Sequence, residues 1–276
     1  MRLKKILECH CFSNSTKNKK NIELFYNYHS PPPLEPIYKI KNYKRKIMRC
    51  KICGHFTAKH EIKVSEFYKK NYSLISHGDD MKKKFNKINN LKSRSDNFHR
   101  VERVLSYFKD FKKKEIDLLD VGSGLSIFLY QLKKKVNWKL VGVEPDINFV
   151  NFAKKLNINV VHSNLKSNIF KNNKFNIITM NKIIEHVKDP VKLLKISKKL
   201  LIKNGYVYIE VPDGVAASRH QEGKFREEFF VDHLHVFSKK SLIRSIKLAG
   251  LSLLFCKSIK EKSGKLSLYA FAKKII

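Results

Sequence analysis

The chain has 276 residues, of which 42% are hydrophobic, so it can bury a full core and exceeds the size of one average domain. The formal net charge is +34, yet only nine of the 58 basic residues are arginine, the residue favoured for bidentate contacts to phosphate and guanine. Lysine is spread over nearly every segment, which indicates a generally cationic surface and argues against a single nucleic-acid-binding stripe.

Hydrophobic stretches are too short for export or membrane insertion. The apolar stretch at the start of the chain stops at Glu8, which is too short for the core of a signal peptide. No stretch approaches the roughly 20 apolar residues that span a bilayer. We therefore expect a soluble, cytoplasmic protein without a membrane span.

Residues 1–64 hold four of the five cysteines and show no sustained periodicity, which predicts a small module held together by a ligand. Cys50 and Cys53, followed by a glycine, have the spacing of a zinc knuckle, in which two thiolates from a tight turn bind one ion. Cys9 and Cys11 are the candidate partner ligands, although a single intervening residue is unusual for two ligands of one zinc. We expect one structural zinc, and a degenerate module without metal is the alternative.

A polar and aromatic connector, residues 65–94, separates this module from a larger domain, residues 95–276. At the start of the larger domain, apolar residues recur at helical spacing after Ser95, a residue type that caps helices. This pattern predicts a first helix of about 12 residues.

From residue 115 onward, apolar strands alternate with amphipathic helices. Strands are expected at 116–121, 140–143, 159–162, 175–180, 206–211, 251–256 and 266–272, and helices at 125–135, 146–155, 190–201 and 238–249. Such alternation requires a parallel sheet covered by helices and joined by right-handed crossovers. The last two strands are too close for a helical crossover, so they form an antiparallel hairpin. The predicted fold class is α/β: a doubly wound, mostly parallel seven-stranded sheet with an antiparallel C-terminal edge hairpin, preceded by the cysteine-containing module.

A glycine turn follows the first of these strands. Gly122 and Gly124 lie between a strand and a helix, where glycines let the backbone approach a ligand and the helix N-terminus offers free amide hydrogens. The second strand ends at Glu144, 24 residues after Asp120. A carboxylate there can accept hydrogen bonds from both hydroxyls of a ribose. The turn alone also occurs in dinucleotide-binding folds, but its combination with Glu144 favours a nucleoside-containing cofactor.

Four ordered motifs resemble those of class I S-adenosylmethionine-dependent methyltransferases. They are Leu119-Asp-Val-Gly-Ser-Gly124, Val143-Glu-Pro-Asp146, Ile184-Glu-His-Val-Lys-Asp-Pro190 and Lys203-Asn-Gly-Tyr-Val-Tyr-Ile-Glu-Val-Pro212. The resemblance covers roughly residues 98–274 and implies S-adenosyl-L-methionine as cofactor and methyl transfer as activity. Similar methyltransferases of sugar and polysaccharide pathways often carry an N-terminal four-cysteine zinc ribbon, and Arg49-Cys-Lys-Ile-Cys-Gly-His-Phe56 resembles that region.

The resemblance also implies the cofactor-side residues. The glycine turn shapes the methionine end, the carboxylate after the second strand holds the ribose, the residues after the third strand lie near adenine, and an asparagine after the fourth flanks the sulfonium. The implied residues are Asp120, Gly122, Ser123, Gly124, Glu144, Asn164, Leu165 and Asn181. Asn164 replaces an acidic residue often found at its position, so its contact is expected to be weaker or to be carried by backbone.

Histidines are the candidate catalytic residues. His186 follows the fourth strand, while His233 and His235 precede the helix at 238–249, so all three belong at the carboxyl edge of the sheet, where ligands bind. A hydroxyl acceptor must lose its proton, which a histidine poised near neutral pH can take. Packing over the cofactor loop is the alternative for His186, and one of His233 and His235 is expected to be structural.

The leading functional hypothesis is a methyltransferase for a small molecule or glycan, with a sugar hydroxyl of surface-polysaccharide biosynthesis as the expected acceptor. An anionic acceptor would suit the cationic surface. One alternative is an RNA methyltransferase, which would require a continuous basic groove beside the cofactor edge. The other is a non-enzymatic zinc- and nucleic-acid-binding protein with a vestigial methyltransferase fold, and the intact glycine turn and Glu144 argue against it.

Overall fold

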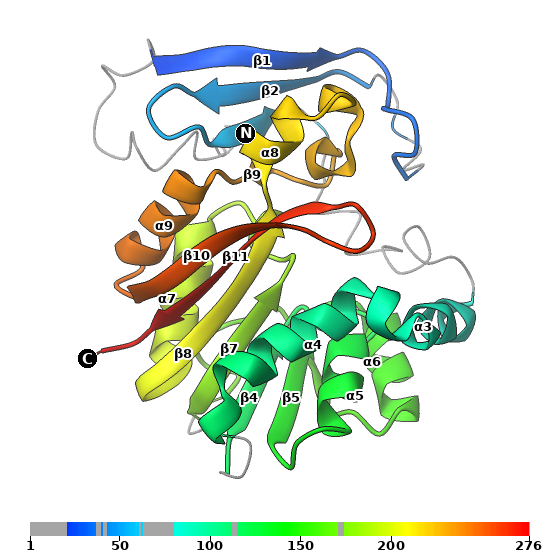
Figure 1. Ribbon diagram of the computed structural model, residues 1–276, viewed down its shortest axis with the longest axis vertical. Helices are drawn as coiled ribbons and strands as arrows, with labels where there is room; N and C mark the ends of the chain where they lie inside the picture. Colours follow the sequence, from blue (N-terminus) through cyan, green and yellow to red (C-terminus); the bar gives the residue numbers. More distant parts are fainter. Residues whose placement is uncertain are drawn as a thin grey trace.

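The computed structural model describes residues 21–36, 40, 43–60, 62, 80–111, 115–170 and 174–275. The chain builds two sheets, with helices around the larger one (Figure 1). Within these described ranges, no helix is long and apolar enough to cross a membrane.

The larger sheet has seven strands in the order β10-β11-β8-β7-β4-β5-β6. The strands are β4 (Asp117–Val121), β5 (Lys139–Glu144), β6 (Val160–His162), β7 (Phe175–Asn181), β8 (Leu201–Pro212), β10 (Ser252–Lys260) and β11 (Leu266–Lys273). Strands β6, β5, β4, β7 and β8 pair in parallel, and β11 runs antiparallel to both β8 and β10. The predicted fold class is therefore confirmed, and the C-terminal hairpin inserts its second strand next to β8.

Helices cover both faces of this sheet, because successive strand residues point to opposite sides. The helices are α4 (Asp96–Tyr107), α5 (Ile127–Lys133), α6 (Ile147–Lys155), α7 (Pro190–Leu200) and α9 (Lys239–Leu248). Leu118 of β4 shares a buried core with α4, α5 and α6, whereas its neighbour Leu119 shares the opposite core with α7 and α9. The carboxyl ends of the parallel strands are left for the loops that carry the candidate site.

Side-chain caps fix the starts of α6, α7 and α9. Asp146 accepts a hydrogen bond from the amide of Asn148 at the start of α6, and Asp189 does so from Lys192 at the start of α7. Ser238 forms a capping box with Ser241 at the start of α9. Each cap satisfies amide groups that a helix leaves unpaired in its first turn, so the preceding loop ends at a defined place.

The smaller sheet joins the N-terminal part of the chain to the larger domain. It contains β1 (Ile22–Tyr28), β2 (Arg45–Cys50), β3 (Phe56–Lys59) and β9 (His235–Val236), in that order. The two residues of β9 pair with Phe56 and Thr57 of β3. Phe56 also shares a buried cluster with Phe229, which precedes β9. Figure 1 shows this sheet beyond the carboxyl end of β8, so strands β1, β2 and β3 lie at the edge of the larger sheet that carries the candidate site.

Further helices occupy the connector and the loops. They are α3 (Met81–Asn90), α8 (Gly214–Arg219) and the 3-10 helices at Lys92–Arg94, Lys109–Phe111, Gly223–Phe225 and Glu227–Phe229. Sequence patterns did not predict α3. Its one buried residue, Phe85, makes edge-to-face contacts with Tyr130 of α5 and Phe152 of α6, and this tertiary packing stabilises an otherwise polar helix.

Candidate active site

The glycine turn after β4 requires glycine for two different reasons. Gly122 and Gly124 have φ angles of 69° and 48°, a region that other residues rarely adopt. A Cβ atom on Gly122 would lie 2.1 Å from Cδ1 of Ile183, whereas a Cβ atom on Gly124 would meet nothing within 4 Å. The amide of Gly122 donates to the carbonyl oxygen of Val143 at 2.8 Å, which ties the turn to β5. Packing thus excludes a side chain at the first glycine, and the second leaves open space above the backbone.

Glu144 meets this turn from the end of the neighbouring strand. Its Oε2 accepts a hydrogen bond from the amide of Gly124 at 2.9 Å, and its Oε1 accepts one from the amide of Asp146 at 3.0 Å. Burial raises the pKa of Glu144, and the two amide hydrogen bonds oppose that rise. The backbone therefore holds a buried acceptor at the carboxyl end of β5, beside the turn.

Asp120 lies on the other side of the turn and is 2% exposed. Its Oδ1 accepts hydrogen bonds from Oγ1 of Thr179 at 2.7 Å and from Nδ2 of Asn181 at 2.9 Å. Burial raises the pKa of Asp120 to about 7, even though both hydrogen bonds oppose the rise. Within the described ranges, Oδ1 of Asn181 and Oγ of Ser123 are buried without a hydrogen-bond partner. The turn is therefore surrounded by polar atoms that a bound ligand can satisfy.

Asn164 and Leu165 follow β6, whose His162 is paired with Glu144 across the sheet. The side chain of Leu165 is buried in the core of the sheet, whereas Asn164 is exposed. The structure thus brings the residues expected near adenine to the same sheet edge as the glycine turn.

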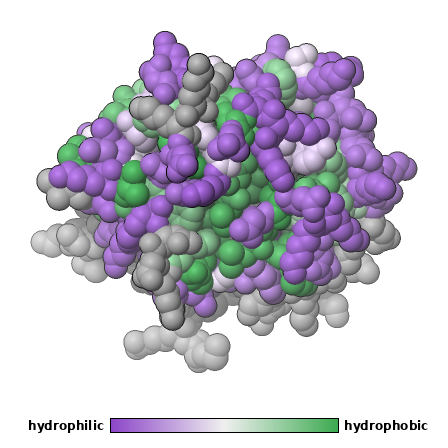
Figure 2. Space-filling model, turned by 90° about the horizontal axis from the view of Figure 1, so that it is seen from below, coloured by the Kyte–Doolittle hydropathy of each residue, from purple (hydrophilic) through white to green (hydrophobic). Residues whose placement is uncertain are grey.

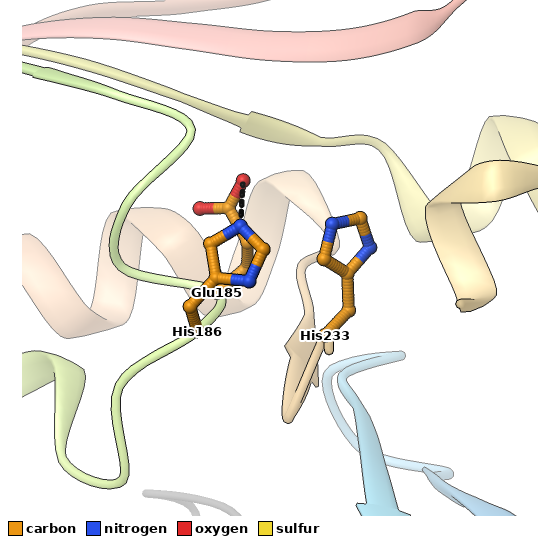
Figure 3. A group of neighbouring side chains, drawn as sticks. All are labelled: Glu185, His186 and His233. Carbon is orange, nitrogen blue, oxygen red and sulfur yellow. Dashed lines mark ion pairs between the residues drawn. The ribbon is translucent and has the colours of Figure 1, made fainter. Parts of the chain in front are cut away.

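Glu185, His186 and His233 form a cluster beyond the end of β7 (Figure 3). One donor atom from each lies within 4.8 Å of the other two, and Nε2 of His186 is 3.9 Å from Oε1 of Glu185. Nδ1 of His186 is 2.9 Å from the carbonyl oxygen of Asp232, and Nδ1 of His233 is 2.9 Å from that of Glu228. Because a carbonyl oxygen can only accept, each Nδ1 carries a hydrogen, and in the neutral tautomer of either ring the lone pair lies on Nε2.

Burial dominates the electrostatics of this cluster. Burial raises the pKa of Glu185, while His186 and Lys182 oppose the rise. Burial also lowers the pKa of His233 to about 4, against the opposing charge of Asp232, so its ring is neutral at physiological pH. Neither carboxylate oxygen of Glu185 has a hydrogen-bond partner in the part of the chain that the structure describes. The cluster thus combines a fully buried carboxyl group with a neutral imidazole.

His235 lies in a separate hydrogen-bonded chain and is 2% exposed. Its Nδ1 is 3.1 Å from Nε2 of His55, whose Nδ1 is in turn 3.1 Å from Oγ of Ser241. Its Nε2 is 3.4 Å from the carbonyl oxygen of Lys188. The structure therefore brings His186 and His233 together with Glu185, whereas it places His235 between β3 and α9.

Sequence reasoning missed Lys182, which follows Asn181 in a left-handed conformation. Nζ of Lys182 lies 2.6 Å from Oγ of Ser267 and 4.0 Å from Oε1 of Glu210. Glu210 in turn accepts two hydrogen bonds from Arg100 of α4, at 3.0 and 2.5 Å. Burial lowers the pKa of Lys182, and the negative charge of Glu210 opposes that decrease. Burial alone would raise the pKa of Glu210, but the positive charges of Arg100 and Lys182 hold the pKa of Glu210 well below its usual range. The position of Glu210 inside a motif was visible in the sequence, but its partners were not.

Cys50 and Cys53 flank a tight turn and are both buried. The amide of Gly54, which has a φ of 73°, donates to the carbonyl oxygen of Cys50 at 2.8 Å. Cys9 and Cys11 lie outside the described residues. In the described part of the chain, Glu185, His186 and His233 are the one group of three metal-ligand residues. The four-cysteine zinc site therefore stays a prediction.

The fold and the cofactor edge define a class of protein. The strand order, the antiparallel strand β11, the glycine turn after β4 and the carboxylate after β5 together are those of class I S-adenosylmethionine-dependent methyltransferases. A family model described as a methyltransferase domain matches residues 93–254, which is more than half of the chain. The chain belongs to this family.

Two solved structures share the fold. A S-adenosylmethionine-dependent methyltransferase of Thermotoga maritima, described as a possible histamine N-methyltransferase, is 17% identical with a TM-score of 0.56 and covers 76% of this chain and 99% of its own. The plantazolicin methyltransferase BpumL, solved with S-adenosylhomocysteine, is also 17% identical, with a TM-score of 0.54 and coverages of 77% and 98%. An uncharacterised protein of Methanocaldococcus jannaschii is 25% identical over 134 residues. That match covers 48% of this chain and 62%, less than two thirds, of the relative.

Proposed function

We propose that this chain is an S-adenosylmethionine-dependent methyltransferase that methylates a hydroxyl group of a small molecule or glycan. The main support is the pair of buried carboxyl groups, Asp120 and Glu144, that flank the glycine turn at adjacent strand ends. Two further buried polar atoms near this turn, Oγ of Ser123 and Oδ1 of Asn181, have no hydrogen-bond partner among the described residues. This edge fits a ligand that carries both ribose hydroxyls and a charged amine.

Different residues of this edge would contact different parts of the cofactor. Glu144 would accept hydrogen bonds from the ribose hydroxyls, and Leu165 and Asn164 would lie beside the adenine. Asp120 and Oδ1 of Asn181 would face the positively charged methionine end, which favours the ionised form of Asp120. When bound, S-adenosylmethionine supplies a methyl group on a positively charged sulfur, which a nucleophile can attack.

The cluster of Glu185, His186 and His233 is the proposed acceptor side. Ile183 packs on the glycine turn, and the cluster begins two residues later, so the acceptor side continues directly from the cofactor side. A hydroxyl must lose its proton to become a good nucleophile. His233 is neutral and has its lone pair on Nε2, so this cluster can promote that loss. The buried hydrogen-bonded chain around His235 makes that residue a structural one in this proposal.

A glycan or small-molecule acceptor is supported better than RNA. Figure 2 views the molecule from the side opposite the carboxyl ends of the parallel strands, and on that face hydrophilic side chains surround a central hydrophobic group. An RNA-binding enzyme needs a continuous basic groove along which phosphates can lie. Lysine is instead spread along the whole sequence, which favours attraction of a compact anionic acceptor, such as a sugar nucleotide.

The N-terminal cysteines form a second part of the proposal. The buried Cys50 and Cys53, on either side of a turn closed by Gly54, support one structural zinc completed by Cys9 or Cys11. Metal analysis of the purified full chain tests this. A chain that is fully folded and contains no zinc would show that the cysteine module is degenerate.

Transfer of a labelled methyl group tests the proposed activity. The full chain is incubated with methyl-labelled S-adenosylmethionine and, in separate reactions, with sugar nucleotides, free sugars, cell-surface polysaccharide and total RNA. We expect label in an ether linkage on a carbohydrate and none in RNA. Label in RNA alone would replace the glycan acceptor with a nucleic acid. A failure to bind S-adenosylmethionine would remove the proposed activity itself.

A further inference from the structure

The cluster of Glu185, His186 and His233 contains a carboxylate to which no group in the described ranges donates a hydrogen bond. Glu185 has no exposed side-chain surface, and neither of its oxygens has a hydrogen-bond partner in the described part of the chain. A buried carboxylate without such partners is costly unless a proton or a cation compensates its charge. The electrostatic environment thus provides a place for a positive charge next to Glu185.

The two histidines present matching donor atoms to this place. The carbonyl oxygens of Asp232 and Glu228 accept hydrogen bonds from Nδ1 of His186 and of His233, so Nε2 is the nitrogen of each ring that carries the lone pair in the neutral tautomer. Metal-ligating histidines characteristically donate their second ring nitrogen to a carbonyl or carboxylate in this way. Figure 3 shows that the side chains of Glu185 and His186 extend side by side and that the ring of His233 stands next to them.

The surrounding charges are compatible with a cation. Asp232 adds a carboxylate whose Oδ2 lies 3.8 Å from Nδ1 of His186. Lys182 is the nearby cation that acts on the pKa values of both Glu185 and His233. Its ammonium group is engaged by Ser267 at 2.6 Å and by Glu210 at 4.0 Å, so other groups of the protein hold it.

We propose that Glu185, His186 and His233 bind a divalent first-row transition-metal ion such as Zn²⁺. Their donor atoms lie within 4.8 Å of one another, so small side-chain rotations bring all three onto one ion. Two imidazoles and one carboxylate suit such ions and leave at least one coordination position open. This inference deepens the proposed function and rests on it for its role: the open position binds the acceptor hydroxyl through its oxygen, and the hydroxyl proton passes to water. The cation lowers the pKa of the bound hydroxyl, which takes the place of direct proton uptake by His233.

Titration of the full chain with Zn²⁺ tests this site without any acceptor. The proteins compared are the wild type, His233→Ala, Glu185→Gln and, as a control, His29→Ala, which changes an exposed histidine after β1. Any zinc held by the cysteines is common to all four. We expect the wild type and His29→Ala to bind one more Zn²⁺ per chain than the two cluster variants. If the variants still bind this ion, we expect their affinity to be more than about 100-fold weaker. Loss of a metal ligand should cost more than the roughly 10–100-fold loss caused by removing a residue that only hydrogen-bonds to a ligand.

Titration with S-adenosylmethionine on the same four proteins separates the possible failures. It also shows that each variant is folded. Equal Zn²⁺ stoichiometry and affinity in all four would overturn the metal site, and the methyltransferase proposal would stand if the cofactor still binds. A Zn²⁺ difference in a chain that does not bind the cofactor would instead support the site and overturn the proposed activity. If only one of Glu185→Gln and His233→Ala folds, the Zn²⁺ stoichiometry of that variant is compared with that of the wild type.

Discussion

The candidate cofactor edge and the proposed acceptor side of this molecule are built in different ways. The cofactor edge consists of contiguous strand-turn-helix segments, in which Asp120, Gly122 and Glu144 occupy fixed places at the ends of β4 and β5. The acceptor side combines the loop after β7 with a segment some 45 residues later, and the N-terminal sheet holds that segment through β9. Local sequence therefore specifies the first region, whereas tertiary pairing specifies the second. Substitutions in the two regions should separate binding of the cofactor from methyl transfer.

The largest expected effect is on the acceptor side. His233→Ala should lower the rate of methyl transfer by roughly 10²–10⁴-fold. The ring of His233 is needed whether it takes the hydroxyl proton itself or binds the proposed metal ion. The affinity for S-adenosylmethionine should be unchanged, since the cofactor edge is intact. Single-turnover kinetics and calorimetry on the same protein measure the two quantities, with His29→Ala as the control. A wild-type rate would remove His233 from the acceptor side.

The second effect concerns the glycine turn. Gly122→Ala should lower the free energy of unfolding by about 2–5 kcal/mol, because a left-handed backbone and a clash with Ile183 add together. Gly264→Ala is the matched control, since its φ of 90° brings the same backbone strain but its Cβ would meet nothing within 4 Å. It should therefore cost only about 1–2 kcal/mol. Denaturant unfolding compares them, and equal losses would show that packing on Ile183 does not constrain the turn.

The third effect is on ribose binding. Glu144→Ala should weaken the binding of S-adenosylmethionine by roughly 1–3 kcal/mol, the usual result of leaving hydrogen-bonding groups unpaired. Calorimetric titration measures the change, and folding is checked by denaturant unfolding. Unchanged affinity would remove Glu144 from the ribose site and undermine the assignment of β5.

The smallest effect is a pH dependence at Asp120. Burial raises the folded-state pKa of Asp120 to about 7, above its unfolded value, so its contribution to stability is full below the unfolded pKa and is lost as pH rises through about 7. A cationic ligand binds the ionised form better, so affinity for S-adenosylmethionine should rise about tenfold from pH 6 to pH 8. Asp120→Asn should remove this rise. A wild-type affinity that is constant over this range would show that Asp120 does not face the charged end of the cofactor.

Much of the larger domain could be predicted because its signals are local. The strands β4, β5 and β7 and the helix α4 appear where apolar periodicity indicates them. Ser95 occupies the N-cap position of α4, as its residue type suggests, but its side chain makes no capping hydrogen bond. The glycine turn and Glu144 were found by their positions at strand ends. Each of these features depends on residues within one strand-turn-helix unit.

The remaining features depend on contacts between distant residues. Strand β9 has only two residues and forms because Phe56 and Thr57 of β3 lie beside it, so no periodicity reveals it. The same strand pairing brings His55 within hydrogen-bond distance of His235. His235, a candidate base in the sequence, is thus part of a buried series of hydrogen bonds. Glu185 was a motif residue, and only the folded structure shows that it lacks hydrogen-bond partners among the residues described.

Calorimetric titration of the full chain with S-adenosylhomocysteine tests the cofactor assignment most directly, because it needs no knowledge of the acceptor. We expect one molecule bound per chain, and we expect NAD, which a glycine turn of another class would bind, to produce no heat of binding. The proposed ribose contact of Glu144 and the open space above Gly124 both support the first result. Binding of NAD, or the absence of any binding of S-adenosylhomocysteine to the folded chain, would contradict the cofactor assignment and with it the proposed methyltransferase activity.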